Sequence, residues 1–296
     1  MRPHSRAPSR AAMFWVAFSD NPFAVAGLLL VILIAAAALA APWITPQDPY
    51  DQASLALMDA RLPPGSVGTG GYTHWLGTDA AGRDLASAIL YGLRTSVFVA
   101  AAAGAAAFSL GALVGIFAAW RGGIAEALVM RAIDLQLSVP AILLALVLVA
   151  LLGQGSGPVI AALIAAQYAY FARTAHAAAS TERHRDYMMA ARSLALRPLR
   201  QMLRHLLPNV LPPLIVVATV QVASAIAIEA TLSFLGLGMK VTEPSLGTLI
   251  ANGFQYMLSG RTWISVYPGM ALLILITAIN LVGDQVRDVL NPRLQH

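Results

Sequence analysis

The acidic residue best placed to take part in chemistry is Glu229, which stands inside an apolar stretch that runs from 210 to 237. A carboxylate is costly in a lipid environment and usually faces a pathway or a partner. Glu229, with Ser233 four residues later, is therefore a candidate to line or gate a pathway across a membrane. The alternative is a structural role at the outer interface, where Glu229 would hold a turn between Ser233 and Gly238.

The sequence lacks the common motifs of enzymes and of cofactor sites. Lys240 is the only lysine, so no Gly-x-x-x-x-Gly-Lys-Ser/Thr loop can bind ATP. There is no His-Glu-x-x-His pair and no Gly-x-Ser-x-Gly elbow, and the six histidines do not pair with carboxylates at ligand spacing. The absence of cysteine excludes disulfides and zinc–thiolate sites. No catalytic residue, cofactor or metal is therefore predicted in this chain.

An arginine-rich segment, 173–209, is the second candidate site. Leucines such as Leu194 stand among its charges, so the segment is amphipathic. Asp186 suits the start of one short helix and Pro198 the first turn of another, with a turn between them at 195–197. Such a unit could dock on another protein or rest on anionic lipid, and the residues alone favour neither.

Six apolar blocks position these candidates. A hydrocarbon core of about 30 Å needs about 20 apolar residues, and several blocks approach that length. Fourteen of the 19 basic residues fall in the segments that would be cytoplasmic if both termini were inside, which is the asymmetry of membrane proteins. We therefore predict an all-α membrane protein with about six crossings, N-in and C-in. The blocks are 24–44, 96–120, 137–152, 159–171, 210–237 and 263–282.

Composition agrees with a membrane protein, since 58% of the residues are hydrophobic and 11% are charged. The net charge of +5 could indicate nucleic acid, but a basic cytoplasmic face explains it better, and no nucleic-acid partner is predicted. A cleaved signal peptide is the alternative for the first block. The predicted organisation is a head with the first helix (1–60), an outer polar segment (61–95) and a five-helix core (96–290) with its inner loop at 173–209.

Two smaller patterns concern helix packing. Asp134 lies near the start of the third block, beside Arg131, and is predicted to anchor a helix at the inner interface rather than to carry protons. Gly111 and Gly115 are spaced to let two helices approach closely.

The arginine-rich segment resembles the cytoplasmic "EAA" loop of ABC importer permeases. Ala190-Ala191 and a later His205-Leu-Leu-Pro208-Asn209 match that loop, whereas Met189 and Ala195 stand where the family usually has Glu and Gly. The stretch His74-Trp-Leu-Gly-Thr-Asp-Ala-Ala-Gly-Arg-Asp is similar to the signature of C-type subunits in the dipeptide/oligopeptide/nickel permease family. The stretches 229–238 and 280–294 resemble the same family, so the likeness covers nearly the whole chain.

This resemblance implies a type I ABC importer permease fold in the cytoplasmic (inner) membrane. Its implied partners are a second homologous permease, two cytoplasmic ATP-binding subunits, a solute-binding protein and the bilayer. The implied activity is alternating-access import of di- or oligopeptides, with nickel or another small solute as the alternative; an ion-coupled secondary transporter or a membrane enzyme is less favoured. The implied ATPase-coupling residues are Asp186, Ala190, Ala191, Arg192, Ala195, Arg200, His205, Pro208 and Asn209.

Overall fold

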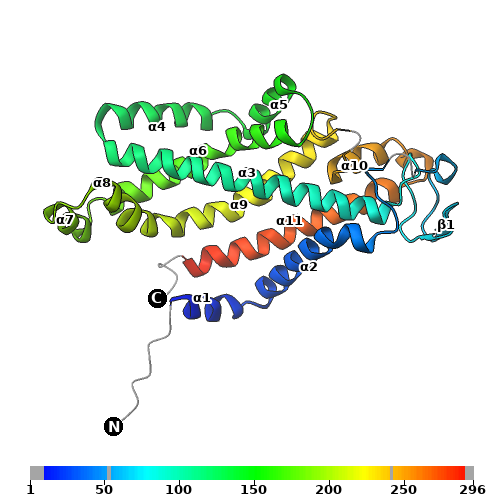
Figure 1. The fold of residues 1–296 in the computed structure, drawn as a ribbon, viewed down its shortest axis with the longest axis horizontal. Helices are drawn as coiled ribbons and strands as arrows, with labels where there is room; N and C mark the ends of the chain where they lie inside the picture. Colours follow the sequence, from blue (N-terminus) through cyan, green and yellow to red (C-terminus); the bar gives the residue numbers. More distant parts are fainter. Residues whose placement is uncertain (1–9, 52–54, 241–242, 291–296) are drawn as a thin grey trace, which may run out of the picture.

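The computed structural model describes residues 10–51, 55–240 and 243–290. Those residues form a bundle of long helices with small capping elements at its two ends (Figure 1). The basic residues Arg2 and Arg6 of the predicted head, and the end of the family-like C-terminal stretch at 291–294, lie outside the described residues. The long helices are α2 (Pro22–Ile44), α3 (Leu85–Arg121), α6 (Ser156–Glu182), α9 (Leu207–Phe234) and α11 (Trp263–Leu290).

Shorter elements connect the long helices. A two-stranded antiparallel sheet pairs β1 (Ser66–Val67) with β2 (Thr73–His74). The short helices are α1 (Arg10–Ser19), η2 (Leu57–Asp59), α4 (Gly123–Leu137), α5 (Ala141–Leu152), α7 (Asp186–Ser193), α8 (Pro198–Arg200), α10 (Leu246–Phe254) and η4 (Met257–Ser259), with a π-helical turn η3 (Gln201–Leu206) between α8 and α9.

The predicted count of six crossings is approximate. Four described stretches are long and apolar enough to span a bilayer, namely α2, α3, α8 to α9 and α11, and the bent pair α4–α5 makes a fifth. The helix α6 has the length, 27 residues, but its polar residues lower its hydropathy. It packs along α3 but is not among the stretches that are long and apolar enough to span a bilayer. The helices α1, α7 and the end of α11 lie toward one end of the bundle and β1 and α10 at the other (Figure 1), as an even number of crossings requires.

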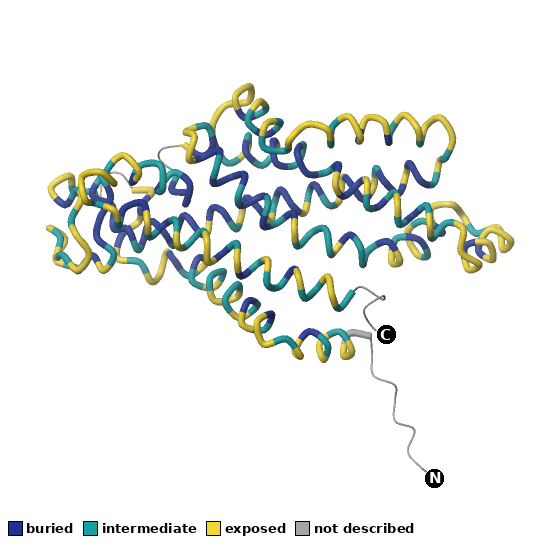
Figure 2. Tube along the Cα trace, turned by 180° about the vertical axis from the view of Figure 1, so that it is seen from behind, coloured by how far each residue is buried: buried dark blue, intermediate teal, exposed yellow. Residues whose placement is uncertain are grey.

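The close packing predicted at Gly111 and Gly115 is confirmed between α3 and α6. A Cβ atom on Gly111 would lie 2.4 Å from the carbonyl oxygen of Tyr168, and one on Gly115 would lie 2.3 Å from the carbonyl oxygen of Ala172. Any side chain at either position would force the two backbones apart. These glycines let α3 and α6 form the centre of the bundle, where buried residues concentrate (Figure 2).

The third apolar block is not one continuous helix, because it begins at the end of α4 and continues into α5. The helix α5 has 12 residues, about 18 Å, which is too short to cross alone. It follows α4 after a break at 138–140, and the two helices meet at 89°. Pro140 lacks an N–H group and cannot continue the helical ladder. Asp134 therefore lies on α4, before this break, and its role as an interface anchor beside Arg131 stays a prediction.

The helix of the fourth apolar block extends beyond the predicted end of that block at Phe171. The helix α6 continues to Glu182, so Arg173, the first residue of the predicted inner segment, is helical. Hydropathy falls at Arg173, which is why the pattern ended the block there. The guanidinium contacts the carboxylate of Asp134 on α4, and both side chains stay about half exposed.

The two ends of the described chain are joined by Gln285 of α11. Asn21 caps α2 by accepting a hydrogen bond from the backbone N–H of Phe23 at 3.0 Å, and its Nδ2 donates to Oε1 of Gln285 at 2.9 Å. Nε2 of Gln285 donates to the carbonyl of Ala17 at 2.9 Å. Gly27 then lets α2 pack against the backbone of α11. We call this arrangement of Ala17, Asn21 and Gln285 the terminal clasp.

Candidate functional site

The arginine-rich segment forms a helix–turn–helix elbow at the inner end of the bundle, which we define as residues 186–206. The helix α7 begins at Asp186, and α8 begins at Pro198 and continues through η3 into α9. Both predicted helix starts and the turn between them are thus confirmed. The absence of a break between α8 and α9 means that a force on the elbow reaches a membrane-spanning helix directly.

The turn of the elbow depends on Ala195, which adopts the left-handed conformation with φ of 48°. Its N–H donates to the carbonyl of Arg192 at 2.9 Å, and the N–H of Leu196 donates to the carbonyl of Ala191 at 3.2 Å. This pair of bonds is a Schellman motif, in which glycine is usual at the left-handed position. Ala195 therefore takes the position that glycine usually occupies in this motif, and its Cβ atom makes the left-handed conformation cost about 1–2 kcal/mol.

A hydrogen-bond chain that sequence reasoning missed fixes the elbow to the helices on either side. The hydroxyl of Tyr187 donates to Oε2 of Glu182 at 2.7 Å and accepts from Nδ2 of Asn209 at 3.2 Å. The same Asn209 amide donates to the carbonyl of His205 at 2.7 Å. Burial, and next the bond to Glu182, raise the pKa of Tyr187 to about 12. The hydroxyl therefore remains a proton donor at any physiological pH.

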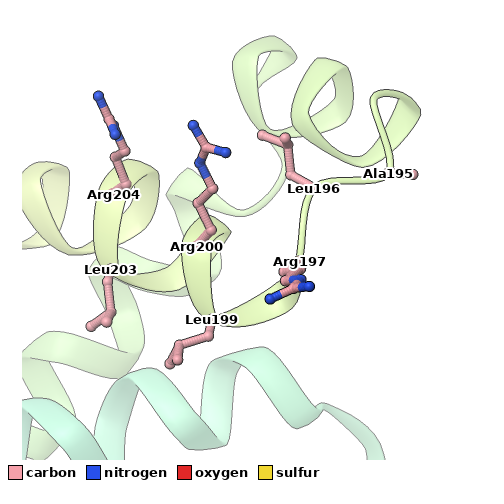
Figure 3. A pocket seen from close by; sticks show the side chains of 7 residues that line it. All are labelled: Ala195, Leu196, Arg197, Leu199, Arg200, Leu203 and Arg204. Carbon is pink, nitrogen blue, oxygen red and sulfur yellow. The ribbon is translucent and has the colours of Figure 1, made fainter.

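One face of the elbow is buried and the other is exposed. Met188 and Ala191 pack inward, and His205 is half-buried. A groove of about 620 Å³ runs along residues 195–204. Figure 3 shows Arg200 and Arg204 on one side of the helix and Leu199 and Leu203 on the opposite side. The other predicted coupling residues, Asp186, Ala190, Arg192, Ala195, Pro208 and Asn209, are exposed.

Exposed leucines accompany these arginines. Leu194 keeps 73% of its surface exposed and Leu199 keeps 66%. Large apolar side chains mixed with arginine on a firm helical unit have the composition of a protein-binding surface. The elbow can therefore combine apolar contact with hydrogen bonds from guanidinium groups.

At the outer end, Glu229 and Ser233 lie together as predicted by their spacing, and both are buried. Oε2 of Glu229 accepts from the hydroxyl of Ser96 on α3 at 2.8 Å, and Oε1 accepts from Ser233 at 2.9 Å. The Ser233 oxygen also accepts from the N–H of Met239 at 3.2 Å. Glu229 therefore joins α3 to α9 and supports the loop that follows α9.

The outer stretch that begins at His74 folds into tight turns ahead of α3. Gly77 takes φ of 80°. Asp84 caps α3, because its carboxylate accepts from the N–H of Ser87 at 2.8 Å, and it also contacts His74 Nδ1 at 2.9 Å. Asp79 instead accepts from the backbone N–H of Arg83 at 3.0 Å. Burial raises the pKa of Asp79, while that hydrogen bond and the Arg83 charge act in the opposite direction.

Two family profiles match the chain. Residues 111–296 match the binding-protein-dependent transport system inner membrane component family, and residues 9–64 match the N-terminal TM domain of oligopeptide transport permease C. The chain belongs to the binding-protein-dependent permease family. It is a multi-pass inner-membrane permease with the fold of an ABC importer subunit.

Relatives of this permease match over nearly their whole length. It is 38% identical to the di/tripeptide transport system permease protein DppC of Pseudomonas aeruginosa strain UCBPP-PA14, over 98% of this chain and 94% of the relative. It is 37% identical to the dipeptide transport system permease protein DppC of Escherichia coli K12, over 95% of this chain and 93% of the relative.

A solved structure shares the fold of this permease. It is an inward-facing form of the MetNI methionine ABC transporter, matched with a TM-score of 0.55 and 23% identity. The match covers 68% of this chain and 96% of the other.

Proposed function

We propose that this permease forms half of the transmembrane path of an ATP-driven importer of di- or oligopeptides. Its relatives over more than nine-tenths of the chain are named as peptide permeases. The observation that carries the proposal is the exposed elbow, which joins α9 without a break. The partners are a second permease, two ATP-binding subunits that grip the elbows, and a solute-binding protein at the outer end.

The elbow acts as a lever in this proposal. The bonds of Tyr187 to Glu182 and Asn209 keep it from swinging freely. Movement imposed by an ATP-binding partner therefore passes into α9, which is 28 residues long, about 42 Å. At the far end of α9, Glu229 is bonded to α3. Closure of the two ATP-binding subunits would thus move the inner and outer ends of the path in one concerted step, as alternating access requires.

The peptide specificity of the proposal has one competitor, the same machinery working on nickel or another small solute. In either case the energy source is a separate ATP-binding chain. A secondary transporter is disfavoured because both oxygens of Glu229 are already occupied by serine hydroxyls.

The coupling role is tested in proteoliposomes that contain the complete importer. Arg200→Glu and Arg192→Glu are expected to leave the complex assembled but to separate ATP hydrolysis from uptake of a radiolabelled dipeptide. Arg261→Glu, at the outer end of the bundle, is the matched control and is expected to keep coupling. Normal coupling in both elbow variants would contradict a contact with the ATP-binding subunits through these arginines.

The solute is tested with the binding protein that accompanies the permease. A dipeptide is expected to raise the melting temperature of the binding protein, because a ligand that binds only the native state stabilises that state. The same dipeptide should then be taken up by the assembled importer. A shift with nickel alone, and uptake of nickel alone, would replace peptides by the competing solute.

A further inference from the structure

The helix that carries the elbow into α9 is weakened where the two meet. The turn η3, Gln201–Leu206, has the wide π-helical form, and the N–H of Leu207 donates to the carbonyl of Met202, five residues back. Pro208 follows directly. A proline inside a helix has no N–H group, and its ring clashes with the carbonyl four residues earlier, which here is that of Arg204. The wider turn relieves this clash, so the proline explains why η3 forms at this place.

Two further prolines extend the weak stretch into α9. Pro212 and Pro213 lie inside α9, and neither can donate to a carbonyl four residues earlier, at Pro208 and Asn209. Each of the three prolines therefore removes one helical hydrogen bond. Helices kink at prolines and at π-helical turns. The segment 201–213 can thus bend at the point where a lever between the elbow and α9 has to be stiff, and we call this segment the hinge.

Apolar packing holds the chain on both sides of the hinge. Leu206 and Val210 are fully buried and belong to one apolar cluster with Phe171 and Ala175 of α6. On the elbow side, Met188 is fully buried. Apolar contacts have no preferred direction, so they keep the elbow against the bundle without fixing its angle to α9.

A hydrogen-bond chain, which we call the latch, crosses the hinge. It consists of Glu182 at the end of α6, Tyr187 on α7 and Asn209 on α9. The hydroxyl of Tyr187 donates to Glu182 at 2.7 Å and accepts from Asn209, 22 residues later, at 3.2 Å. Among the described residues, the bond between Tyr187 and Asn209 is the side-chain hydrogen bond that joins α7 to α9. One hydroxyl therefore ties the end of α6, the elbow and the start of α9 together.

We propose that Tyr187 is a positioning residue for energy coupling, because its hydroxyl stiffens the hinge so that a displacement of the elbow turns α9 and is not absorbed by bending of η3. The inference rests on the proposed function, since it needs an ATP-binding partner that moves the elbow. Tyr187 acts through Asn209 and contacts no solute in this role. Loss of the hydroxyl would leave ATP hydrolysis on the partner intact, while its movement would be lost in the hinge.

Removal of single hydroxyl groups tests the latch. Tyr187→Phe keeps the ring and removes both bonds. Tyr170→Phe is the matched control, since Tyr170 lies on α6, is 38% exposed against 37% for Tyr187, and its hydroxyl makes no hydrogen bond to the described residues. Each variant is reconstituted with the complete importer in proteoliposomes, and the ATP hydrolysed per radiolabelled dipeptide taken up is measured. We expect this ratio to rise about fivefold for Tyr187→Phe, the factor that corresponds to one lost hydrogen bond, and to stay at the wild-type value for Tyr170→Phe.

A reversible cross-link separates positioning from a general loss of stability. The chain has no cysteine, so Tyr187→Cys combined with Asn209→Cys places two unique thiols at the two ends of the latch. The double variant, assembled with cysteine-free partner subunits, should hydrolyse more ATP per dipeptide than the wild type. Cross-linking with a short bis-methanethiosulfonate should return the ratio to the wild-type value, and a reducing agent should raise it again. Tyr187→Cys alone, treated in the same way, should stay uncoupled.

Equal ratios for Tyr187→Phe and Tyr170→Phe would overturn the inference. A cross-linked double variant that remains uncoupled, in a complex that assembles and hydrolyses ATP, would overturn it as well. Both results are read against wild-type uptake driven by ATP, so they leave the proposed function standing. A wild-type importer that takes up neither dipeptide nor nickel with ATP would instead remove the proposed function, and the latch with it.

Discussion

Ser96 on α3 and Glu229 on α9 are joined by a 2.8 Å hydrogen bond that spans 133 residues of sequence. The second carboxyl oxygen is used within α9, by Ser233. Both oxygens of a fully buried acid are thus occupied, and each bond restrains a different element: one holds α3, and the other supports the loop after α9. The acid therefore works as a joint between elements at the outer end of the bundle.

The joint predicts a difference between two substitutions of Glu229. Glu229→Gln keeps one acceptor and one donor and should cost little stability. Glu229→Ala leaves buried hydroxyls of Ser96 and Ser233 without this partner, at about 1–3 kcal/mol for each group left unsatisfied. Thermal unfolding of the detergent-purified permease should show a clearly lower midpoint for the alanine variant. Equal midpoints for the two variants would show that the joint contributes nothing to stability.

The contact between α3 and α6 predicts which glycines tolerate a side chain. Gly115→Val forces a branched side chain against the backbone of Ala172 and should destabilise by about 1–3 kcal/mol or more, as overpacking does. Gly157→Ala is the control, because nothing lies within 4 Å of a Cβ atom there. That change in α6 should be neutral or stabilising by about 0.5–1 kcal/mol. The unfolding midpoint should therefore fall for Gly115→Val and stay the same or rise for Gly157→Ala.

The left-handed residue of the elbow predicts a graded series at Ala195. Ala195→Gly removes the steric penalty of this conformation and should keep or raise the stability of the elbow. Ala195→Val adds a branched side chain at positive φ and should cost more than the about 1–2 kcal/mol that alanine costs relative to glycine. Limited proteolysis from the cytoplasmic side reports the order directly. Faster cleavage of the glycine variant than of the valine variant would contradict the turn.

The buried carboxyl of Asp79 predicts a pH dependence of the outer turns. Because burial raises its pKa in the folded state, the unfolded segment releases this proton first as the pH rises. The stabilising contribution of the protonated acid is therefore present at low pH and is lost as the pH rises from the ordinary value of 3.8 through the raised pKa.

Asp79→Asn should remove this dependence while keeping an acceptor for the backbone. External protease should cleave the wild-type segment around 55–84 progressively faster than the variant as the pH rises through that window. A constant ratio of the two rates across the window would show that Asp79 does not set the pH response.

Much of the bundle follows from apolar length and helix signals in the sequence. Asp186 and Pro198 were sufficient to predict where the elbow helices begin, because helix starts are local features. The contact between Asp134 and Arg173 was not predicted, because a hydropathy window counts each charge as a cost. It carries no information about a partner 39 residues away. The chain of Tyr187, Glu182 and Asn209 was missed for the same reason.

The terminal clasp has a consequence for how the permease is made. Gln285 contacts Asn21 and Ala17 across 264 and 268 positions, and a ribosome synthesises α2 long before α11. At about 5–20 residues per second, the face of α2 that carries Gly27 stays without its α11 partner for roughly 10–50 s, until α11 has been synthesised. The first helix to enter the bilayer is thus among the last to find its final packing, and a chain stopped short of α11 exposes that unfinished face to the quality-control proteases of the membrane.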